Sequence, residues 1–290
     1  MTEIYKSQKG KLAIEALYRD ALQRWPVPSR QMVVPTRQGG TFVVACGDDH
    51  AAPIVLFHGS GTNSSVWIRD VADLAEHHRV YAVDMIGEPG FSAPSRPPLA
   101  SDAYASWLDD VWNALGLSAA SVVGVSLGGW LALDYAVRRP ERVVSVSLLS
   151  PSGIGGVNTF FLARVALLLL AGRWGRRRSF KLVAGPGRAR EVSQFVTTVF
   201  QHFRPRLERV PIRTDEELSA LRVPVQAIVG GKDALIRSKE TRERLEALVP
   251  RVEVTYLEQE GHILPSQATA ISQFTTAAWS PLIVSRLRES

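Results

Sequence analysis

One serine lies in a residue pattern that could make it a nucleophile. Ser126 is the centre of G-V-S-L-G at residues 124–128, which fits G-x-S-x-G. Small apolar residues before it predict a buried strand, and residues 127–135 predict a helix. A strand that turns into a helix within five residues strains the central residue, and flanking glycines allow the close approach. The serine hydroxyl would then stand at the carboxyl edge of a sheet, with the Leu127 amide directed at an oxyanion on an attacked carbonyl.

The general base for such a serine would be a histidine. His262 follows a predicted strand at residues 252–257, which places it at the sheet edge where active sites of open α/β sheets assemble. His58 precedes a glycine-rich turn and is expected to order that loop instead. His77 and His78 end a polar helix and are expected to be solvated. The sequence therefore favours His262 as the base.

The acid that orients the imidazole is predicted at Asp233, directly after a buried strand at residues 223–229. The chain order Ser126, Asp233, His262 is the order of nucleophile, acid and histidine in α/β-hydrolase architectures. Asp84 also ends a predicted strand, but it precedes the nucleophile and is expected to fix the loop after it.

A second oxyanion donor is expected from the loop after the strand at residues 53–57. This loop reads H-G-S-G at residues 58–61. The Ser60 N–H is the preferred donor, together with the Leu127 N–H, and Gly61 is the alternative. The sequence does not decide which amide turns inward.

Alternating strand and helix patterns predict how these residues are positioned. Apolar strand runs separated by helical segments predict an α/β fold with a doubly wound, mostly parallel sheet of about eight strands. Residues 1–150 and 222–290 form the predicted core, with an N-terminal helix extension at about 9–25. Glycine and proline breaks, together with apolar helical stretches, distinguish residues 151–221 as an inserted helical cap.

Length and composition limit the remaining options. The 290 residues are 46% hydrophobic and 21% charged, which is ordinary for a globular protein. The single cysteine, Cys46, forms no internal disulfide and no cysteine-based metal site, so a reducing compartment is expected. The amino terminus lacks the apolar run of a signal peptide, which predicts a cytoplasmic protein. No metal or organic cofactor is expected, and the oligomeric state stays open, with a homodimer among the options.

The formal net charge of +6 comes mainly from arginine, with the densest cluster at Arg173 and residues 176–178. No nucleic-acid-binding motif accompanies this cluster, so a solvated face is favoured over a nucleic-acid partner. The apolar run Phe160–Ala171 contains Arg164 and is too short to span a bilayer, which needs about 20 apolar residues. The expected partner is a small-molecule substrate.

Taken together, the chain resembles α/β-hydrolase-fold serine hydrolases, and more narrowly bacterial carboxylesterases with an N-terminal helix extension. The resemblance covers nearly the whole chain, and its pieces are W-P-V-P at 25–28, H-G at 58–59, V-D-M-I-G at 83–87, G-V-S-L-G-G at 124–129, R-P-E-R-V at 139–143, G-K-D at 231–233 and G-H at 261–262. The triad pieces are shared by the whole fold, and only the N-terminal piece points to the narrower group.

This resemblance implies hydrolysis of carboxyl esters of small to medium apolar acids or alcohols through an acyl-enzyme. Carbon–carbon bond hydrolases, lactonases, thioesterases and cofactor-free haloperoxidases share the triad and stay open as alternatives. An alternative of another class is a hydrolase-fold ligand receptor without catalysis.

Overall fold

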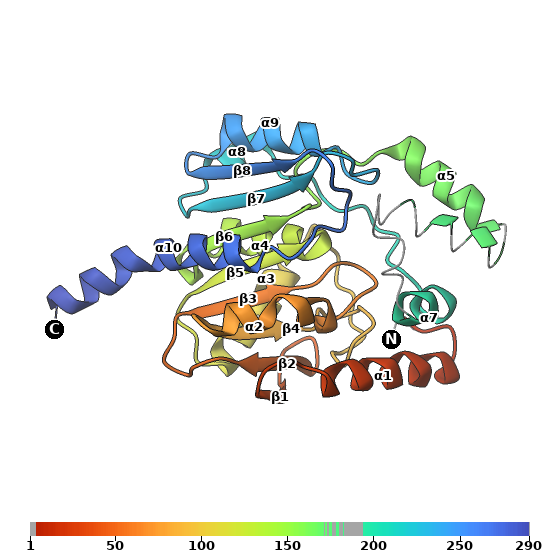
Figure 1. Ribbon diagram of the computed structural model, residues 1–290, viewed down its shortest axis with the longest axis horizontal. Helices are drawn as coiled ribbons and strands as arrows, with labels where there is room; N and C mark the ends of the chain where they lie inside the picture. Colours follow the sequence, from red (N-terminus) through yellow and green to blue (C-terminus); the bar gives the residue numbers. More distant parts are fainter. Residues whose placement is uncertain are drawn as a thin grey trace.

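An eight-stranded sheet forms the centre of the protein, as the computed structural model shows (Figure 1). The structure describes residues 4–170 and 194–289, together with 172, 174, 175, 178, 179 and 182. The strand order is β1-β2-β4-β3-β5-β6-β7-β8. The strands are β1 (Ser29–Val34), β2 (Thr41–Cys46), β3 (Pro53–Phe57), β4 (Arg79–Val83), β5 (Ala120–Val125), β6 (Val143–Leu149), β7 (Val225–Gly230) and β8 (Val252–Leu257).

Only β2 runs opposite to the other strands of the sheet. β2 pairs antiparallel with both β1 and β4, and all other neighbours are parallel. One row of the register runs from Phe57 through Gly124, Leu148 and Ala227 to Val254, across five parallel strands. The loops that follow these strands therefore emerge at one edge of the sheet, which is where the predicted site residues lie. The predicted mostly parallel sheet of about eight strands is confirmed.

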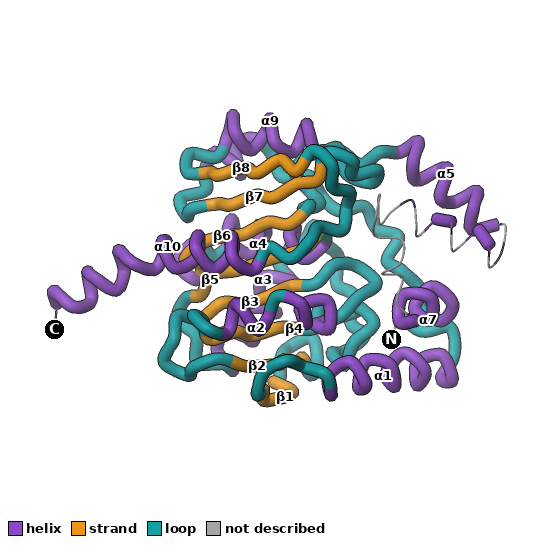
Figure 2. Tube along the Cα trace, in the orientation of Figure 1, coloured by secondary structure: helices purple, strands orange, loops and turns teal. Residues whose placement is uncertain are grey.

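Helices cover both faces of the sheet (Figure 2). Leu131 of α4 and Leu245 of α9 belong to the apolar core on one face, whereas Leu74 of α2 and Ile271 of α10 belong to the core on the other. This double covering explains why the inner parallel strands β3 and β5 are buried almost throughout, whereas the edge strand β8 alternates. The helices are α1 (Gln8–Gln23), α2 (Val71–Ala75), α3 (Ala103–Ala114), α4 (Leu127–Arg138), α5 (Thr159–Leu170), α7 (Gln194–His202), α8 (Asp215–Ser219), α9 (Ser238–Leu248) and α10 (Ala268–Glu289), with short 3₁₀ turns η1 (Ser64–Arg69) and η2 (Pro140–Arg142).

The helical stretch between β3 and β4 is divided in two. The 3₁₀ turn η1 ends at Arg69, and the short helix α2 starts at Val71. Asp70 stands between them, and its carboxylate accepts hydrogen bonds from the Ser266 hydroxyl and the Gln267 N–H instead of capping α2. A contact with residues almost 200 positions away thus overrides the local helical pattern.

The segment between β6 and β7 carries α5, α7 and α8. α7 lies beside α1 (Figure 1), and a Cβ added at Gly10 of α1 would lie 2.6 Å from the His202 Cβ. The glycine therefore allows the two helices to touch. At the two ends of the segment, Ile154 and Leu218 are fully buried in the core. The division at 151 and 221 stays a proposal.

Parts of two sequence predictions fall outside the described residues. The arginine cluster has three such residues, Arg173, Arg176 and Arg177, and the apolar run has one, Ala171 at its end. No helix in the described ranges is long and apolar enough to cross a membrane.

Candidate active site

Ser126 stands in a strained backbone conformation between β5 and α4. Its φ of 53° and ψ of −111° lie in a region that L-residues rarely adopt. The glycines around it are required by sterics: a Cβ added at Gly124 would lie 2.1 Å from the Gly128 carbonyl oxygen, and one at Gly128 would lie 2.3 Å from the Phe57 oxygen. The predicted steric role of both glycines is confirmed.

Backbone hydrogen bonds fix this turn from both sides. The Ser126 N–H donates to the Leu149 carbonyl at 3.0 Å, and the Ser126 carbonyl accepts from Trp130 and Ser152 N–H at 3.1 and 3.0 Å. Leu127 is the first residue of α4, where N–H groups have no partner within the helix. The Leu127 amide therefore stands at a helix N-terminus next to Ser126, as an oxyanion donor requires.

Asp233 and His262 are in direct contact at the same edge of the sheet. The distance from His262 Nδ1 to Asp233 Oδ2 is 2.7 Å, and the Asp233 side chain has no exposed surface. The loops that carry them are packed together, because a Cβ added at Gly230 would lie 2.2 Å from the Gly261 carbonyl oxygen. The structure thus brings together two of the residues that the sequence singled out.

The two oxygens of Asp233 have separate partners. Oδ1 accepts the N–H groups of Leu235 and Ile236 at 2.8 and 2.9 Å, and Oδ2 faces the imidazole. A carboxylate is an acceptor only, so Nδ1 of His262 carries the proton and Nε2 keeps its lone pair. In the neutral form of this ring, Nε2 is therefore the nitrogen that can take a proton. α9 starts later, with Arg237 at its N-cap, so Asp233 does not cap it.

The predicted oxyanion loop lies next to the nucleophile. A Cβ added at Gly59 would lie 3.6 Å from the Ser126 Cβ. The Gly61 N–H, the alternative donor, donates to Glu88 Oε2 at 2.6 Å. No hydrogen bond from the Ser60 N–H is formed within the described residues, so of these two amides Ser60 is the one that stays available.

Ser126 and His262 do not form a hydrogen bond with each other in the described part of the chain. Contacts of this kind are often loose in proteins without substrate. The structure thus places Ser126, Ser60 and Leu127 at one sheet edge with the Asp233–His262 pair, and joins only that pair directly.

His58 and Asp84 organise the surrounding loops, as the sequence predicts. His58 is fully buried; its Nδ1 donates to the Gly59 carbonyl at 2.9 Å and its Nε2 accepts the Met85 N–H at 2.9 Å. Burial lowers the pKa of this histidine, although Asp84 opposes the shift, which keeps the ring neutral. Both ring nitrogens are occupied by backbone groups, so His58 is no general base here.

Asp84 accepts hydrogen bonds from three different parts of the chain. Its Oδ1 accepts from the Tyr18 hydroxyl at 2.8 Å and the Ser64 hydroxyl at 2.7 Å, and its Oδ2 accepts the Phe91 N–H at 2.9 Å. The carboxylate ties α1, η1 and the loop after β4 together.

The expectation that His78 is solvated is wrong. His78 is 1% exposed, and its Nε2 lies 3.0 Å from the Thr275 hydroxyl of α10. Burial lowers its pKa. The local sequence contains no sign of this, because the covering helix comes almost 200 residues later in the chain.

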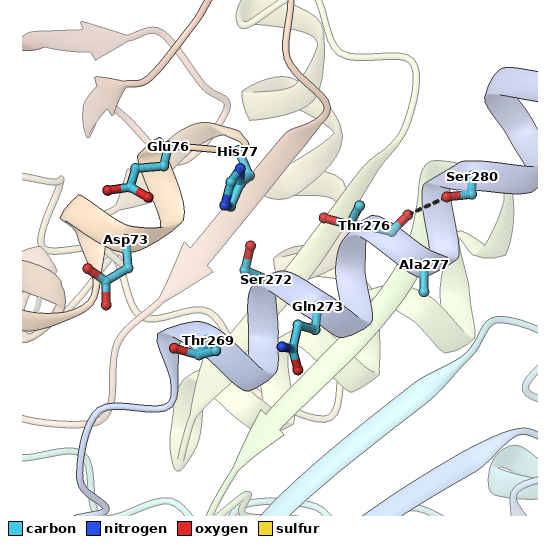
Figure 3. Close-up of a pocket in the computed structure, with 9 residues that line it drawn as sticks. All are labelled: Asp73, Glu76, His77, Thr269, Ser272, Gln273, Thr276, Ala277 and Ser280. Atoms are coloured by element: carbon cyan, nitrogen blue, oxygen red, sulfur yellow. Dashed lines mark hydrogen bonds between the residues drawn. The ribbon is translucent and has the colours of Figure 1, made fainter.

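A pocket of about 610 Å³ lies between the end of α2 and α10, away from these residues (Figure 3). Asp73, Glu76 and His77 line it on one side, and Thr269 and Gln273 on the other. None of the predicted site residues lines this pocket. The described residues also include no group of three or more metal-ligating side chains.

Cys46 is expected to be irrelevant to catalysis. The thiol on β2 is 1% exposed, and burial raises its pKa, which disfavours the reactive thiolate. Iodoacetamide applied to the native protein should leave activity unchanged, with mass spectrometry showing an unmodified thiol. Loss of activity together with alkylation at Cys46 would contradict this expectation.

Comparison with known proteins identifies the family. The model of the alpha/beta hydrolase family matches residues 54–274. A protein of Bacillus subtilis named uncharacterized carboxylesterase nap is 31% identical over 261 residues, which is 85% of each chain, and carboxylesterase YbfK of the same species is 30% identical over 85% of this chain and 86% of its own. The crystal structure of naproxen esterase from Bacillus subtilis has a TM-score of 0.83 at 28% identity and covers 95% of this chain and 100% of its own. The protein therefore belongs to the alpha/beta hydrolase family, and relatives that match it along most of its length are bacterial carboxylesterases.

Proposed function

We propose that the protein is a serine carboxylesterase in which Ser126 is the nucleophile, His262 the general base and Asp233 the acid that orients it. The observation that carries the proposal is the 2.7 Å contact between His262 Nδ1 and Asp233 Oδ2 at the sheet edge that also holds the strained Ser126. This contact leaves Nε2 as the nitrogen that accepts a proton.

Each proposed step uses a group at this edge. Ser126 Oγ attacks the ester carbonyl while His262 Nε2 takes its proton, and the Ser60 and Leu127 N–H groups stabilise the resulting oxyanion. His262 then gives the proton to the departing alcohol, which leaves an acyl-enzyme. A water molecule, activated by the same histidine, releases the acid. No metal or organic cofactor takes part in this scheme.

The relatives favour ester cleavage over the other reactions of this triad. Carboxylesterase nap and carboxylesterase YbfK align with 85% of this chain at 31% and 30% identity. The intact acid–histidine contact favours an enzyme over a receptor without catalysis. We therefore rank ester hydrolysis above lactone, thioester and carbon–carbon bond cleavage.

Apolar residues of α7 and of the loops at this sheet edge support substrates with apolar groups. Phe195 of α7, Val125 before Ser126 and Leu264 after His262 pack against the same apolar cluster. Val199, one turn further along α7, has its Cγ1 3.8 Å from the position of a Cβ added at Gly61. We propose that residues 151–221 act as a cap and that α7 supplies its acyl- or aryl-binding wall.

A panel of purified substrates tests this function. Nitrophenyl esters of short to medium acids should be cleaved faster than long-chain triglycerides, in a graded profile, because one methylene in an apolar pocket changes the preference by only about 1–3 kcal/mol. The measurement is kcat/KM for esters, thioesters, lactones and vinylogous diketones. Cleavage of a lactone or a diketone without any ester would end the esterase proposal and leave the family assignment intact.

Phe195→Ala tests the wall itself. Opening the wall should raise the octanoate-to-acetate ratio of kcat/KM by about 10-fold, the lower end of the effect of one pocket contact. Leu207→Ala is the matched control, because Leu207 is 91% exposed. Ser126 should still react with a fluorophosphonate in both variants. An unchanged ratio in Phe195→Ala would remove α7 from the acyl site.

A further inference from the structure

A buried carboxyl group touches the proposed oxyanion loop. Glu88, in the loop after β4, is 3% exposed, and its Oε2 accepts the Gly61 N–H at 2.6 Å. The Ser60 hydroxyl lies close enough to favour the charged form of the same carboxyl group. Glu88 thus holds the loop through the Gly61 amide, with the side chain of the preceding residue nearby.

Four charged or titratable side chains from separate segments surround Glu88. The guanidinium groups of Arg96 and Arg206 interact electrostatically with its carboxyl group, and so do the hydroxyl groups of Tyr5 and Tyr104. Both guanidinium groups have other partners that fix them: Arg96 donates to the Gly87 and Arg204 carbonyls, and Arg206 donates to the Pro97 carbonyl and the Tyr104 hydroxyl.

Burial is the dominant influence on this carboxyl group. It raises the pKa of Glu88 to about 7, although the Gly61 N–H and the two arginines favour the charged form. Burial of an ionised carboxyl group costs folding free energy even beside two arginines, and strongly shifted groups of this kind gather at functional sites.

The hydrogen bonds of the loop show which of its amide N–H groups is occupied and which is available. The Gly59 carbonyl accepts from His58 Nδ1 at 2.9 Å and from the Thr62 hydroxyl at 2.6 Å. In a trans peptide the N–H points opposite to the carbonyl, so the Ser60 N–H is directed away from these two donors. The next amide, that of Gly61, is occupied by Glu88, and its φ of 69° is one that glycine adopts without strain.

We propose that Glu88 is a positioning residue that binds the Gly61 amide and thereby leaves the Ser60 amide to stabilise the oxyanion. This inference rests on the proposed function, since the oxyanion is that of ester cleavage. Glu88 itself does not touch the substrate. An ionised carboxylate holds the Gly61 N–H more firmly than a protonated one, because charge-assisted hydrogen bonds are stronger.

A pair of substrates isolates the oxyanion contact. An ester and its thionoester differ only in the atom that becomes the anion, and sulfur is the larger atom and the weaker acceptor. The ratio of their kcat/KM values therefore reports the fit of the oxyanion donors. Since both reactions use His262 in the same way, the proton transfer that it performs is common to both and cancels in the ratio.

Glu88→Ala should impair the fit of the oxyanion donors. We expect kcat for the ester to fall by about 10²-fold with little change in KM, since that is the lower range for loss of one oxyanion donor. The ester-to-thionoester ratio should shrink accordingly. Asp134→Asn is the matched control: Asp134 of α4 is also fully buried, its pKa is also raised by burial, and it pairs with Arg138 and Arg213. That variant should lower the melting temperature and keep the ratio of the wild type.

Glu88→Gln keeps an acceptor for the Gly61 N–H but does not titrate. In the wild type the ester-to-thionoester ratio should fall as the pH drops below about 7, where Glu88 takes up a proton, whereas the ratio of Glu88→Gln should be constant with pH. This variant also answers the question if Glu88→Ala fails to fold.

The pH dependence of folding stability tests the protonation of Glu88 independently. The folded-state pKa lies above the ordinary value, so the native state binds the proton more tightly than the unfolded chain does. The stabilisation from this proton is complete below about pH 4.5 and is lost as the pH rises to about 7. Glu88→Gln should not show this loss, so its melting temperature relative to the wild type should increase between pH 5 and pH 8.

The outcomes separate this proposal from the proposed function. If the wild-type protein cleaves esters, an unchanged ester-to-thionoester ratio in Glu88→Ala would overturn the role of Glu88 alone. So would an ester-to-thionoester ratio in Glu88→Gln that still varies with pH. A ratio that shrinks equally in Asp134→Asn would do the same. Absence of ester turnover in the wild type would overturn both proposals.

Discussion

Ser126→Ala should reduce kcat by about 10⁶-fold, as removal of the nucleophile does in a serine protease. The residue stands at φ 53°, between a strand and a helix whose contacts exclude side chains at the neighbouring glycines. Alanine has a Cβ like serine, so it meets the same backbone strain and the turn should persist. The loss should therefore reflect the missing hydroxyl and not a change of fold.

Labelling with a fluorophosphonate checks this result directly. The wild-type protein should gain one adduct, located by peptide mass spectrometry at Ser126, and Ser126→Ala should gain none. Ser95→Ala is a suitable control, because Ser95, in the loop after β4, has a partly buried hydroxyl that donates to the Gln38 side chain. Equal labelling of Ser126→Ala and the wild type would place the nucleophile elsewhere in the chain.

The turn around Ser126 and the parallel sheet were predictable because their causes are local. Five consecutive residues dictate the strand-to-helix turn, since a Cβ at either flanking glycine would collide with backbone within 2.3 Å. The inner parallel strands β3 and β5 are buried on both faces because helices cover both. Asp233 and His262 were suggested by their places after predicted strands that end at the same edge, together with chain order, and the structure puts His262 Nδ1 2.7 Å from Asp233 Oδ2.

Features that depend on distant segments were not predictable in this way. His78 is buried by α10, and Asp70 is drawn to the segment before α10, so neither outcome follows from neighbouring residues. Glu88 was also missed. Its signal was an acidic residue within the glycine- and proline-rich loop at 84–92, but only the folded chain shows that its carboxyl group meets the Gly61 amide.

Asp233→Asn should cost roughly 10⁴-fold in kcat, the loss found when the same change is made in the type case of a serine protease. The expected orientation of the new amide follows from the contacts of Asp233. Its Oδ1 accepts two backbone N–H groups, from Leu235 and Ile236, so the amide oxygen of asparagine should take this place. The amide nitrogen, a donor only, then faces His262 Nδ1.

This orientation gives the proposed loss its mechanism. A donor opposite Nδ1 favours the tautomer in which Nε2 carries the proton, and a protonated Nε2 cannot take the proton of Ser126. The loop should stay in place, because both backbone contacts of Oδ1 persist. We therefore expect kcat to fall while KM and the melting temperature change little, as steady-state kinetics and thermal unfolding of the variant would show. A loss of kcat below about tenfold would assign the acid to another residue, because an enzyme with the correct tautomer would then still be present.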